Sequence, residues 1–339
     1  MAQEAGLPYV PDCHVKPSSH RPNLAPETAN DVPIIDLAML RQGTDERSSA
    51  IKQVANACRH FGFFQIVNHG ICRSILDEAI TLAIGFFKLP TEEKMKFMST
   101  DVYKPVRYAT SLTGEVDGVQ LCRAFLKLYS HPLKDYIDDW PNNPPDYREK
   151  MGNYCVEVRK VALEIMGAIT ESLGIGTTYL TTKMEDGIQV MVVNCYPPCP
   201  KPDLAVGLAP HSDHSCLTII LQSTPGLEIL DTQVGKWRIV PKLDGALQVL
   251  VGDHLEVLSN GIYKSVVHKA GLNSDMTRIS IASFHSLGMD EQMVTAKELV
   301  DDQHPKKYKD SSFRDFLNFL YKTDMTEGAR FIHTLKIKE

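Results

Sequence analysis

After Gly187 the chain reads Ile-Gln-Val-Met-Val-Val over residues 188–193, a short apolar run rich in β-branched side chains. Runs of the same kind follow, separated by Gly, Pro and Asn-Gly. They occupy 217–221, 226–230, 246–251, 256–258 and 278–284. Short strands at such close spacing are typical of a sandwich, a barrel or a jelly roll. We therefore predict a compact β core in this part of the chain.

The rest of the chain is mainly helical in its pattern. Apolar residues recur at helical spacing over 45–60, 73–88, 91–98, 148–173, 294–300 and 311–323. Two short strands are predicted at 32–37 and 63–67, and 101–147 is predicted to be irregular. The pattern therefore predicts an α+β protein, with a β core between an N-terminal and a C-terminal helical region.

Composition excludes several classes of protein. The chain has 339 residues, 43% of them hydrophobic, and a formal net charge of −6. This is a globular composition, and the negative charge argues against a nucleic-acid or membrane-surface partner. The first residues do not read as a secretory signal, and the eight scattered cysteines show no CxxC spacing. We expect a reduced, cytoplasmic protein that does not enter a membrane, and a monomer, since nothing in the pattern predicts an obligate assembly.

The strongest chemical signal is His211-Ser212-Asp213. Residues i and i+2 of a strand point the same way, so this imidazole and carboxylate can share one face. With a distant histidine they would form the two-histidine, one-carboxylate triad that holds Fe(II). The pair alone is weak, because His254-Leu255-Glu256 meets the same specification. His214 would point to the opposite face of the strand, and spacing does not choose among these groups.

Sequence context does choose among them. In order, the chain carries NCYPPCP at 194–200, LAPHSD at 208–213, LTIILQ at 217–222, PGL at 225–227, VGD at 251–253, LSNGIYKSVVH at 258–268 and RISIA at 278–282. This series resembles the Fe(II)/2-oxoglutarate-dependent dioxygenases of plant specialised and hormone metabolism, which include flavanone 3-hydroxylase-like and anthocyanidin synthase-like enzymes. Their pattern is H-x-D, a distant H, and R-x-S shortly after it.

The N-terminal half resembles the leading domain of the same family. The matching segments are 32–37, 57–65, 68–70, 89–90 and 93–94. The resemblance implies a double-stranded β-helix (jelly-roll) core flanked by helices. It divides the chain into an extended arm (1–30), a helical dioxygenase domain (31–185), the jelly-roll core (186–290) and a helical tail (291–339).

The resemblance also implies roles for individual residues. The iron ligands would be His211, Asp213 and His268, with no further catalytic residue. Arg278 would pair with the distal carboxylate of 2-oxoglutarate, which suits a guanidinium fork, and Ser280 would add a hydroxyl. Asn194 and Tyr196 would position the other end of the cosubstrate. The implied cofactor is Fe(II), with 2-oxoglutarate and O2 as cosubstrates and ascorbate as reductant.

The implied reaction is hydroxylation, or alternatively desaturation, of a small plant metabolite, with release of succinate and CO2. Flavonol and anthocyanidin synthases carry Lys where this chain has Val192, and Phe-x-Glu where it has Phe284-His285-Ser286. These departures argue against those two activities. The candidate substrate contacts are Phe284, Arg107, Tyr108, Phe125 and Lys127. They favour an apolar, aromatic molecule.

Three other interpretations stay open. An ethylene-forming type of oxidase shares the triad and R-x-S but uses ascorbate instead of 2-oxoglutarate. A catalytically silent binding protein on the same scaffold would have no need for an intact triad, which argues against it. A zinc hydrolase is the weakest alternative, because no motif supplies its general base.

Overall fold

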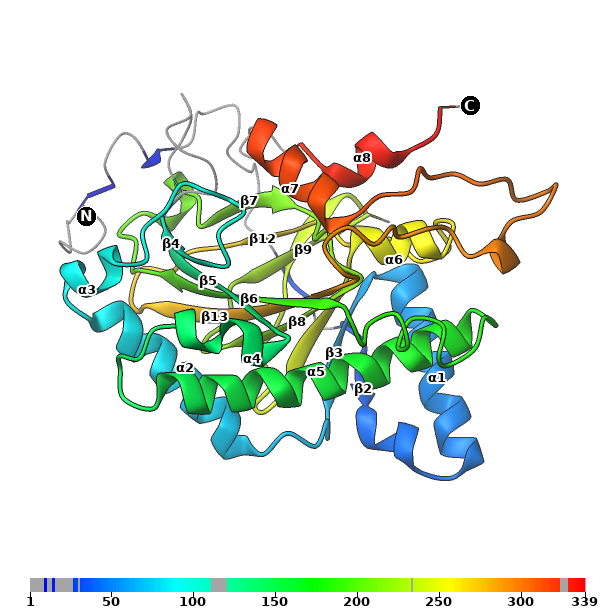
Figure 1. Cartoon of the computed structure of the whole chain (residues 1–339), viewed down its shortest axis with the longest axis horizontal. Helices are drawn as coiled ribbons and strands as arrows, with labels where there is room; N and C mark the ends of the chain where they lie inside the picture. The colour runs from blue at the N-terminus through cyan, green and yellow to red at the C-terminus, as the bar shows by residue number, and fades with distance from the viewer. Residues whose placement is uncertain are drawn as a thin grey trace.

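The computed structural model describes residues 9–10, 14–15, 27–29, 31–110, 121–232, 234–323 and 329–338. Two β-sheets form its centre, as Figure 1 shows. The larger sheet has the order β2 (Ile34–Asp36), β3 (Phe63–Val67), β11 (Leu247–Val251), β8 (Leu217–Gln222), β13 (Arg278–Ser286), β6 (Ile188–Tyr196), β5 (Ala124–His131) and β4 (Val106–Ala109). The smaller sheet has the order β1 (Glu27–Thr28), β10 (Lys236–Ile239), β9 (Leu227–Asp231), β12 (His268–Ala270) and β7 (Leu208–His211). This is the predicted α+β jelly roll.

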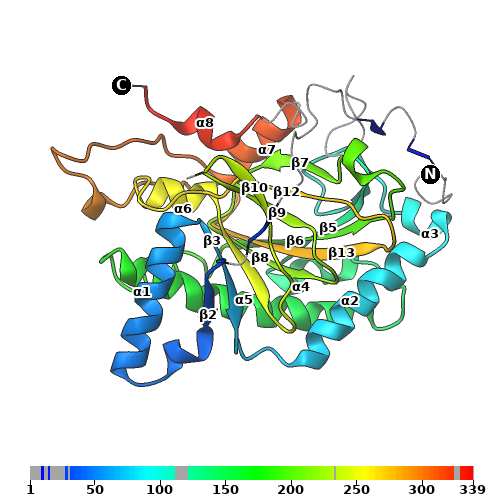
Figure 2. The same ribbon diagram turned by 180° about the vertical axis from the view of Figure 1, so that it is seen from behind.

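Helices cover the outer face of the larger sheet. They are α1 (Thr44–His60), α2 (Arg73–Lys88) and the long α5 (Tyr147–Ser172). Figures 1 and 2 show α7 (Phe313–Lys322) and α8 (Phe331–Leu335) on the opposite side of the molecule, beside the smaller sheet. The short helices are α3 (Thr91–Met95), α4 (Leu133–Tyr136) and α6 (Asp253–Leu258), and 3-10 turns lie at Leu37–Arg41, Ile137–Asp139, Pro202–Leu204 and Lys297–Leu299.

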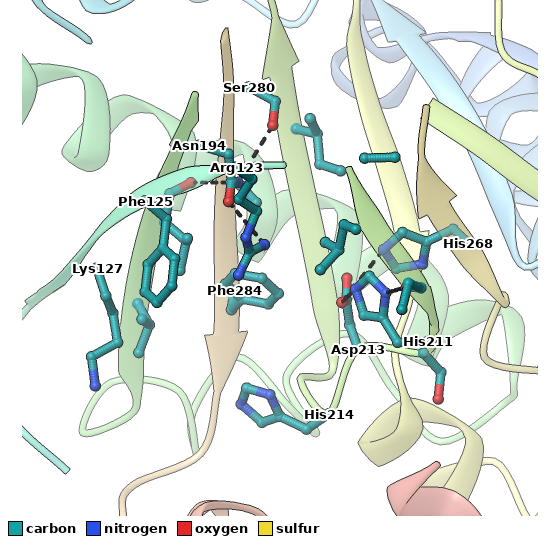
Figure 3. A pocket seen from close by; sticks show the side chains of 18 of the residues that line it. Arg123, Phe125, Lys127, Asn194, His211, Asp213, His214, His268, Ser280 and Phe284 are labelled. Atoms are coloured by element: carbon teal, nitrogen blue, oxygen red, sulfur yellow. Dashed lines mark hydrogen bonds and ion pairs between the residues drawn. The ribbon is translucent and has the colours of Figure 1, made fainter. Parts of the chain in front are cut away.

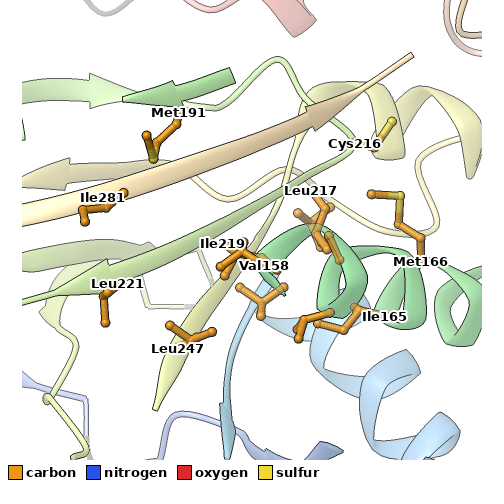
Figure 4. Packing of buried hydrophobic residues seen from close by; sticks show 14 of the residues in the cluster. Val158, Ile165, Met166, Met191, Cys216, Leu217, Ile219, Leu221, Leu247 and Ile281 are labelled. Atoms are coloured by element: carbon orange, nitrogen blue, oxygen red, sulfur yellow. The ribbon is translucent and has the colours of Figure 1, made fainter. Parts of the chain in front are cut away.

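Strand β8 is buried on both faces, and its alternation divides the core in two. Leu217, Ile219 and Leu221 face α5 in a large apolar cluster (Figure 4). Ile220 points the other way and packs with Ile229 in a second cluster between the two sheets. Because each face of the strand meets an apolar layer, β8 reads as a continuous apolar run rather than an alternating one.

The prediction that 101–147 is irregular was wrong, because β4 and β5 lie within it. Every residue of β5 from Phe125 to Ser130 is buried, including Lys127, so the strand shows no contrast between a buried and an exposed face. The predicted strand at 256–258 was also wrong, since these residues belong to the wholly buried helix α6. A short apolar run does not distinguish a buried strand from a buried helical turn.

Other boundaries shift by less. The helix predicted at 91–98 ends at Met95, and 294–300 contains only a 3-10 turn. Most of the predicted arm, 1–30, lies outside the described residues, although β1 within it runs parallel to β10. The four-part division of the chain stays a prediction. Among the helices that the structure describes, none has both the length and the apolar character that a membrane crossing requires.

Candidate active site

Two neighbouring strands of the smaller sheet bring His211 and His268 together. β7 ends at His211, β12 begins at His268, and the two residues are partners in the antiparallel register. Their ring centroids lie 4.2 Å apart. Asp213 follows two residues after His211, and one ligand atom from each of the three residues lies within 4.8 Å of the other two. Figure 3 shows the three side chains converging on one side of a cavity.

The hydrogen bonds of both imidazoles suit metal binding. His211 Nδ1 lies 2.8 Å from the carbonyl of Ala209, and His268 Nδ1 lies 3.3 Å from that of Val266. Because a carbonyl only accepts, we assign the proton to Nδ1 in each ring, which leaves Nε2 as the ligand atom. The two Nε2 atoms lie 3.5 and 3.6 Å from Asp213 Oδ1. Asp213 Oδ2 is buried and has no hydrogen-bond partner among the described residues.

The charge states of the cluster also suit a cation. Burial alone would raise the pKa of Asp213, but the neighbouring His268 and His211 side chains outweigh it and hold that pKa below its usual range. Burial lowers the pKa of His268 to about 4, so its imidazole is neutral at physiological pH. One carboxylate and two neutral imidazoles are the ligand set of the non-haem iron triad.

Arg278 lies on the larger sheet, across the register from Tyr196. Its Nη2 donates to Gln222 Oε1 at 2.9 Å, and its guanidinium carbon lies 5.0 Å from the centroid of the Tyr196 ring. Its Nη1 is buried and has no hydrogen-bond partner among the described residues. A Cβ added at Gly226 would lie 2.7 Å from the Arg278 side chain, so this glycine makes room for the guanidinium. Arg278 therefore has one donor available for an anionic ligand.

Ser280 and Asn194 face each other across the same pair of strands. Asn194 Nδ2 donates to Ser280 Oγ at 3.4 Å, and Asn194 Oδ1 accepts from Arg123 at 3.1 Å (Figure 3). The structure thus brings all seven predicted metal and cosubstrate residues to one cavity. Sequence reasoning missed Gln222 and Arg123, and neither has a spacing that distinguishes it from a surface residue.

The predicted substrate residues divide into two groups. Arg107, Phe125, Lys127 and Phe284 line the cavity, whereas Tyr108 does not. The prediction that Tyr108 lies at the substrate cavity does not agree with the structure. Its side chain points to the other side of β4 and packs edge-on against Phe86, with ring centroids 6.1 Å apart. The reason is that Arg107 and Tyr108 are adjacent in a strand, so their side chains point to opposite faces.

Helix α7 supplies a wall of the cavity that was not predicted. Phe313, Phe316, Leu317 and Leu320 line it from one helical stripe, whose i, i+3, i+4, i+7 spacing indicates an apolar face but does not distinguish a core from a cavity. His214 stacks on Phe316 with ring centroids 4.0 Å apart. Burial lowers the pKa of His214 to about 3, so it is a neutral aromatic wall residue.

The competing pair, His254 and Glu256, lies in helix α6 rather than on a strand. Glu256 Oε2 accepts from the backbone and hydroxyl of Ser265 at 2.7 and 3.0 Å, and its Oε1 accepts from Tyr308 at 2.8 Å. These contacts give the carboxylate a structural role. Within the described part of the chain, the cluster around Asp213 is the one group suited to a metal ion.

Comparisons with known proteins agree with this geometry. The family described as the 2OG-Fe(II) oxygenase superfamily matches residues 187–287, and the family described as non-haem dioxygenase in morphine synthesis N-terminal matches 32–147. The 2-oxoglutarate-dependent dioxygenase 21, chloroplastic, of Oryza sativa subsp. japonica is 47% identical over 335 residues, covering 98% of this chain and 99% of that protein. Flavanone 3-dioxygenase 3 of the same organism is 48% identical over 307 residues, covering 90% and 93%.

A solved structure is similar over almost the whole chain. The crystal structure of JOX2 in complex with 2OG, Fe and JA superposes with a TM-score of 0.87 at 31% sequence identity. The match covers 99% of this chain and 96% of that one.

Proposed function

Because the chain belongs to the 2OG-Fe(II) oxygenase superfamily, we propose that His211, Asp213 and His268 hold its iron beside the cavity in which a small-molecule substrate is hydroxylated. The enzyme is a dioxygenase that uses Fe(II) and 2-oxoglutarate. The observation that carries the proposal is the convergence of two Nε2 atoms and Asp213 Oδ1 at the wall of the cavity that also contains Arg278.

The residues of the larger sheet would bind the cosubstrate. Arg278 Nη1 would donate to the distal carboxylate of 2-oxoglutarate, with the Ser280 hydroxyl beside it, because that nitrogen has no hydrogen-bond partner in the part of the chain that the structure describes. Asn194 and Tyr196 would orient the other end of the molecule. When bound, the iron supplies the activation of O2 that is coupled to decarboxylation of 2-oxoglutarate to succinate and CO2, with ascorbate as reductant. The apolar walls would keep water away from the reacting bond.

The substrate would be a small plant metabolite with an apolar or aromatic body. Phe125, Phe284, Phe313 and Phe316 supply aromatic surface to the cavity. Substrate names attached to the relatives differ from one another, so the relatives give the chemical class of the reaction rather than the molecule.

We also propose that the protein works as a cytoplasmic monomer without a nucleic-acid partner. No disulfide joins two of the seven described cysteines, which agrees with a reducing compartment. One rice relative is named chloroplastic, and that name gives the location of the relative rather than of this chain. Size-exclusion chromatography with light scattering would test the monomer, and a fluorescent fusion of the full chain would test the location.

The test of the function uses purified protein with Fe(II), ascorbate and 2-oxoglutarate in air, together with a plant metabolite extract. We expect succinate to rise together with a product that is one oxygen heavier, or two hydrogens lighter, than its precursor. The control is Arg278→Ala, which removes the cosubstrate anchor. Product without succinate would instead indicate the ascorbate-dependent oxidase, and no product at all would indicate a silent binding protein.

A further inference from the structure

The segment 329–338, which contains helix α8, lies against the part of the jelly roll that supplies the iron ligands. Figures 1 and 2 show α8 beside α6 and α7. Its apolar residues Phe331, Ile332 and Leu335 are buried. The backbone N–H of Ile332 donates to Asp253 Oδ2 of α6 at 3.2 Å. Both apolar packing and a hydrogen bond therefore hold α8 on the core.

Arg330 comes directly before α8, and its guanidinium bridges two hydroxyl groups. Its Nε donates to Ser212 Oγ and its Nη2 donates to Ser265 Oγ, each at 3.3 Å. Both serines are buried. Ser212 lies between the first two iron ligands in the sequence, and Ser265 lies three residues before His268. One side chain thus contacts both of the chain segments that supply iron ligands.

Strand pairing alone does not fix all three ligands. The ladder between β7 and β12 pairs His211 with His268, but β7 ends at His211, so Asp213 lies beyond the ladder. Contacts from outside the sheet have to hold this end of the site. One comes from α6, where the backbone N–H of Asp253 donates to the Asp213 carbonyl at 2.7 Å. The hydrogen bond from Arg330 to Ser212, the residue before Asp213, is another.

The shape of a guanidinium suits this task. Its nitrogens are planar and rigidly spaced, so two donors of one group hold two acceptors at a defined separation. Here the acceptors are hydroxyl groups on two segments that are far apart in the sequence, at positions 212 and 265. Arg330 therefore limits how far these segments can move relative to each other.

The position of Arg330 is itself fixed by the substrate wall. The next residue, Phe331, packs against Phe316 and Phe319 of α7, with ring centroids 5.6 and 5.5 Å apart. Phe316 lines the cavity. The segment that carries Arg330 therefore contacts both the metal site and the wall that faces the substrate.

We propose that Arg330 is a positioning residue of the iron site, which sets the separation of the ligand atoms by holding Ser212 and Ser265 together. It acts through these two serines rather than as a ligand. The inference rests on the proposed function and deepens it, because it assigns the C-terminal segment a role in metal binding. Outer contacts that orient metal ligands affect metal affinity as well as activity.

The first experiment measures metal binding to the full chain, with Co(II) alone as the probe, by isothermal titration calorimetry. Arg330→Met removes both donors, and Lys336→Met is the matched control because it removes an exposed cation from the same segment. We expect Arg330→Met to raise the Kd for Co(II) by about tenfold and the control to leave it unchanged. The visible absorption of bound Co(II), which depends on ligand geometry, should change in Arg330→Met alone.

The outcomes separate the inference from the proposed function. Unchanged affinity and absorption in Arg330→Met would overturn the inference and leave the proposed function intact. If the wild-type protein shows no Co(II) binding that Asp213→Ala removes, the proposed metal site fails and the inference fails with it.

The second experiment distinguishes positioning from general docking of α8. We expect the α8 amides of Arg330→Met to keep their protection against hydrogen exchange, because the buried side chains of the helix are unchanged. Loss of that protection together with weaker Co(II) binding would contradict a positioning role and assign the effect to docking of the helix.

A double-mutant cycle tests the bridge itself. Arg330→Met should weaken Co(II) binding less in a Ser212→Ala background than in the wild type, because the two side chains share one hydrogen bond. Fully additive effects of the two substitutions would contradict the bridge.

Discussion

Asp213 lies between the two histidines of the metal site, and both of their Nε2 atoms face its Oδ1. We predict that Asp213→Ala lowers bound iron and succinate production by about 100-fold or more, since it removes a ligand and the negative charge that balances the cation. Metal analysis after Fe(II) loading and desalting, together with a succinate assay, measures both. His214→Phe is the control, because it keeps the aromatic stack on Phe316 and should retain iron. Full iron content in Asp213→Ala would rule out the proposed ligand set.

Gly226 has a φ of +149° and lies against Arg278, where an added Cβ would be 2.7 Å from the guanidinium side chain. We predict that Gly226→Ala raises the KM for 2-oxoglutarate by about tenfold, because it displaces Arg278 and adds backbone strain of about 1–3 kcal/mol. Steady-state kinetics with varied 2-oxoglutarate measures this. Gly235→Ala is the matched control: its φ is also positive, but its Cβ would meet no atom within 4 Å. Equal effects in both variants would mean that backbone strain, rather than Arg278, sets the KM.

The Lys127 ammonium titrates near neutral pH. Its pKa is lowered to about 7 by burial and by Arg107, with Asp101 acting weakly in the opposite direction, and it faces the Val102 carbonyl and the Tyr129 ring. Lys127 is therefore charged below about pH 7 and loses its charge above it. Since Lys127 is a candidate substrate contact, we predict that kcat/KM for a substrate that accepts from its ammonium group falls above pH 7, by up to about tenfold per pH unit.

The pH profile of Lys127→Arg checks this prediction, because arginine keeps its charge throughout this range. The ratio of the wild-type to the Lys127→Arg value of kcat/KM should fall from pH 6 to pH 9. A constant ratio would mean that Lys127 does not contribute charge to substrate binding.

Helix α7 both lines the cavity and begins with a stabilising cap. Ser312 begins it with a capping box: the Ser312 hydroxyl accepts from the Asp315 backbone, and Asp315 Oδ2 accepts from the Ser312 backbone at 2.8 Å. We predict that Ser312→Ala destabilises the first turn by about 1 kcal/mol. Because Phe313 and Phe316 lie in that turn and line the cavity, the requirement for substrate should rise while the KM for 2-oxoglutarate stays constant.

Hydrogen exchange of the α7 amides, measured by mass spectrometry, reports the local opening. Ser172→Ala, at the end of α5, is a comparison in which a hydroxyl is lost far from α7 along the chain. Unchanged exchange in α7 of the Ser312→Ala protein would contradict the role of the cap.

The sequence predicted those elements whose pattern has one interpretation. The limits of α2 agree with the prediction at both ends, because a helical apolar stripe is bounded by Gly70 and Pro90. β5 was missed because its two faces are both buried and one of them carries Lys127 into a cavity, with Arg123 directly before the start of the strand, so the strand looks like an irregular polar segment. The fold supplies the reason for those charges, and no local pattern does.

The same limit applies to the site. Spacing did not separate His211-x-Asp213 from His254-x-Glu256, and only the motifs around them did. The structure gives the physical distinction: the second pair lies in α6, where hydrogen bonds occupy the carboxylate. The wall formed by α7 was not predicted, because an amphipathic helix looks the same whether its apolar stripe meets a core or a cavity.

At the scale of the molecule, the larger sheet has apolar layers on both faces, and the layer against α5 should dominate stability. We predict that Ile219→Ala, at a fully buried position in that layer, lowers the free energy of unfolding by about 2–5 kcal/mol. Urea denaturation of the metal-free protein measures it. The control is Val156→Ala on α5. Val156 is 39% exposed, so its truncation should change the free energy of unfolding by less than about 0.5 kcal/mol. Similar losses in both variants would disprove the importance of this layer.

The position of β4 at the end of the larger sheet has a consequence for how such an enzyme acquires new reactions. Arg107 and Lys127 lie on the last two strands of that sheet and Arg123 lies just before β5, whereas two of the three iron ligands belong to strands of the other sheet. Mutations at these positions should therefore change the walls of the cavity without displacing the iron ligands. A combinatorial library limited to positions 107, 123, 125 and 127 would explore that freedom directly, and natural duplication of the gene could follow the same route.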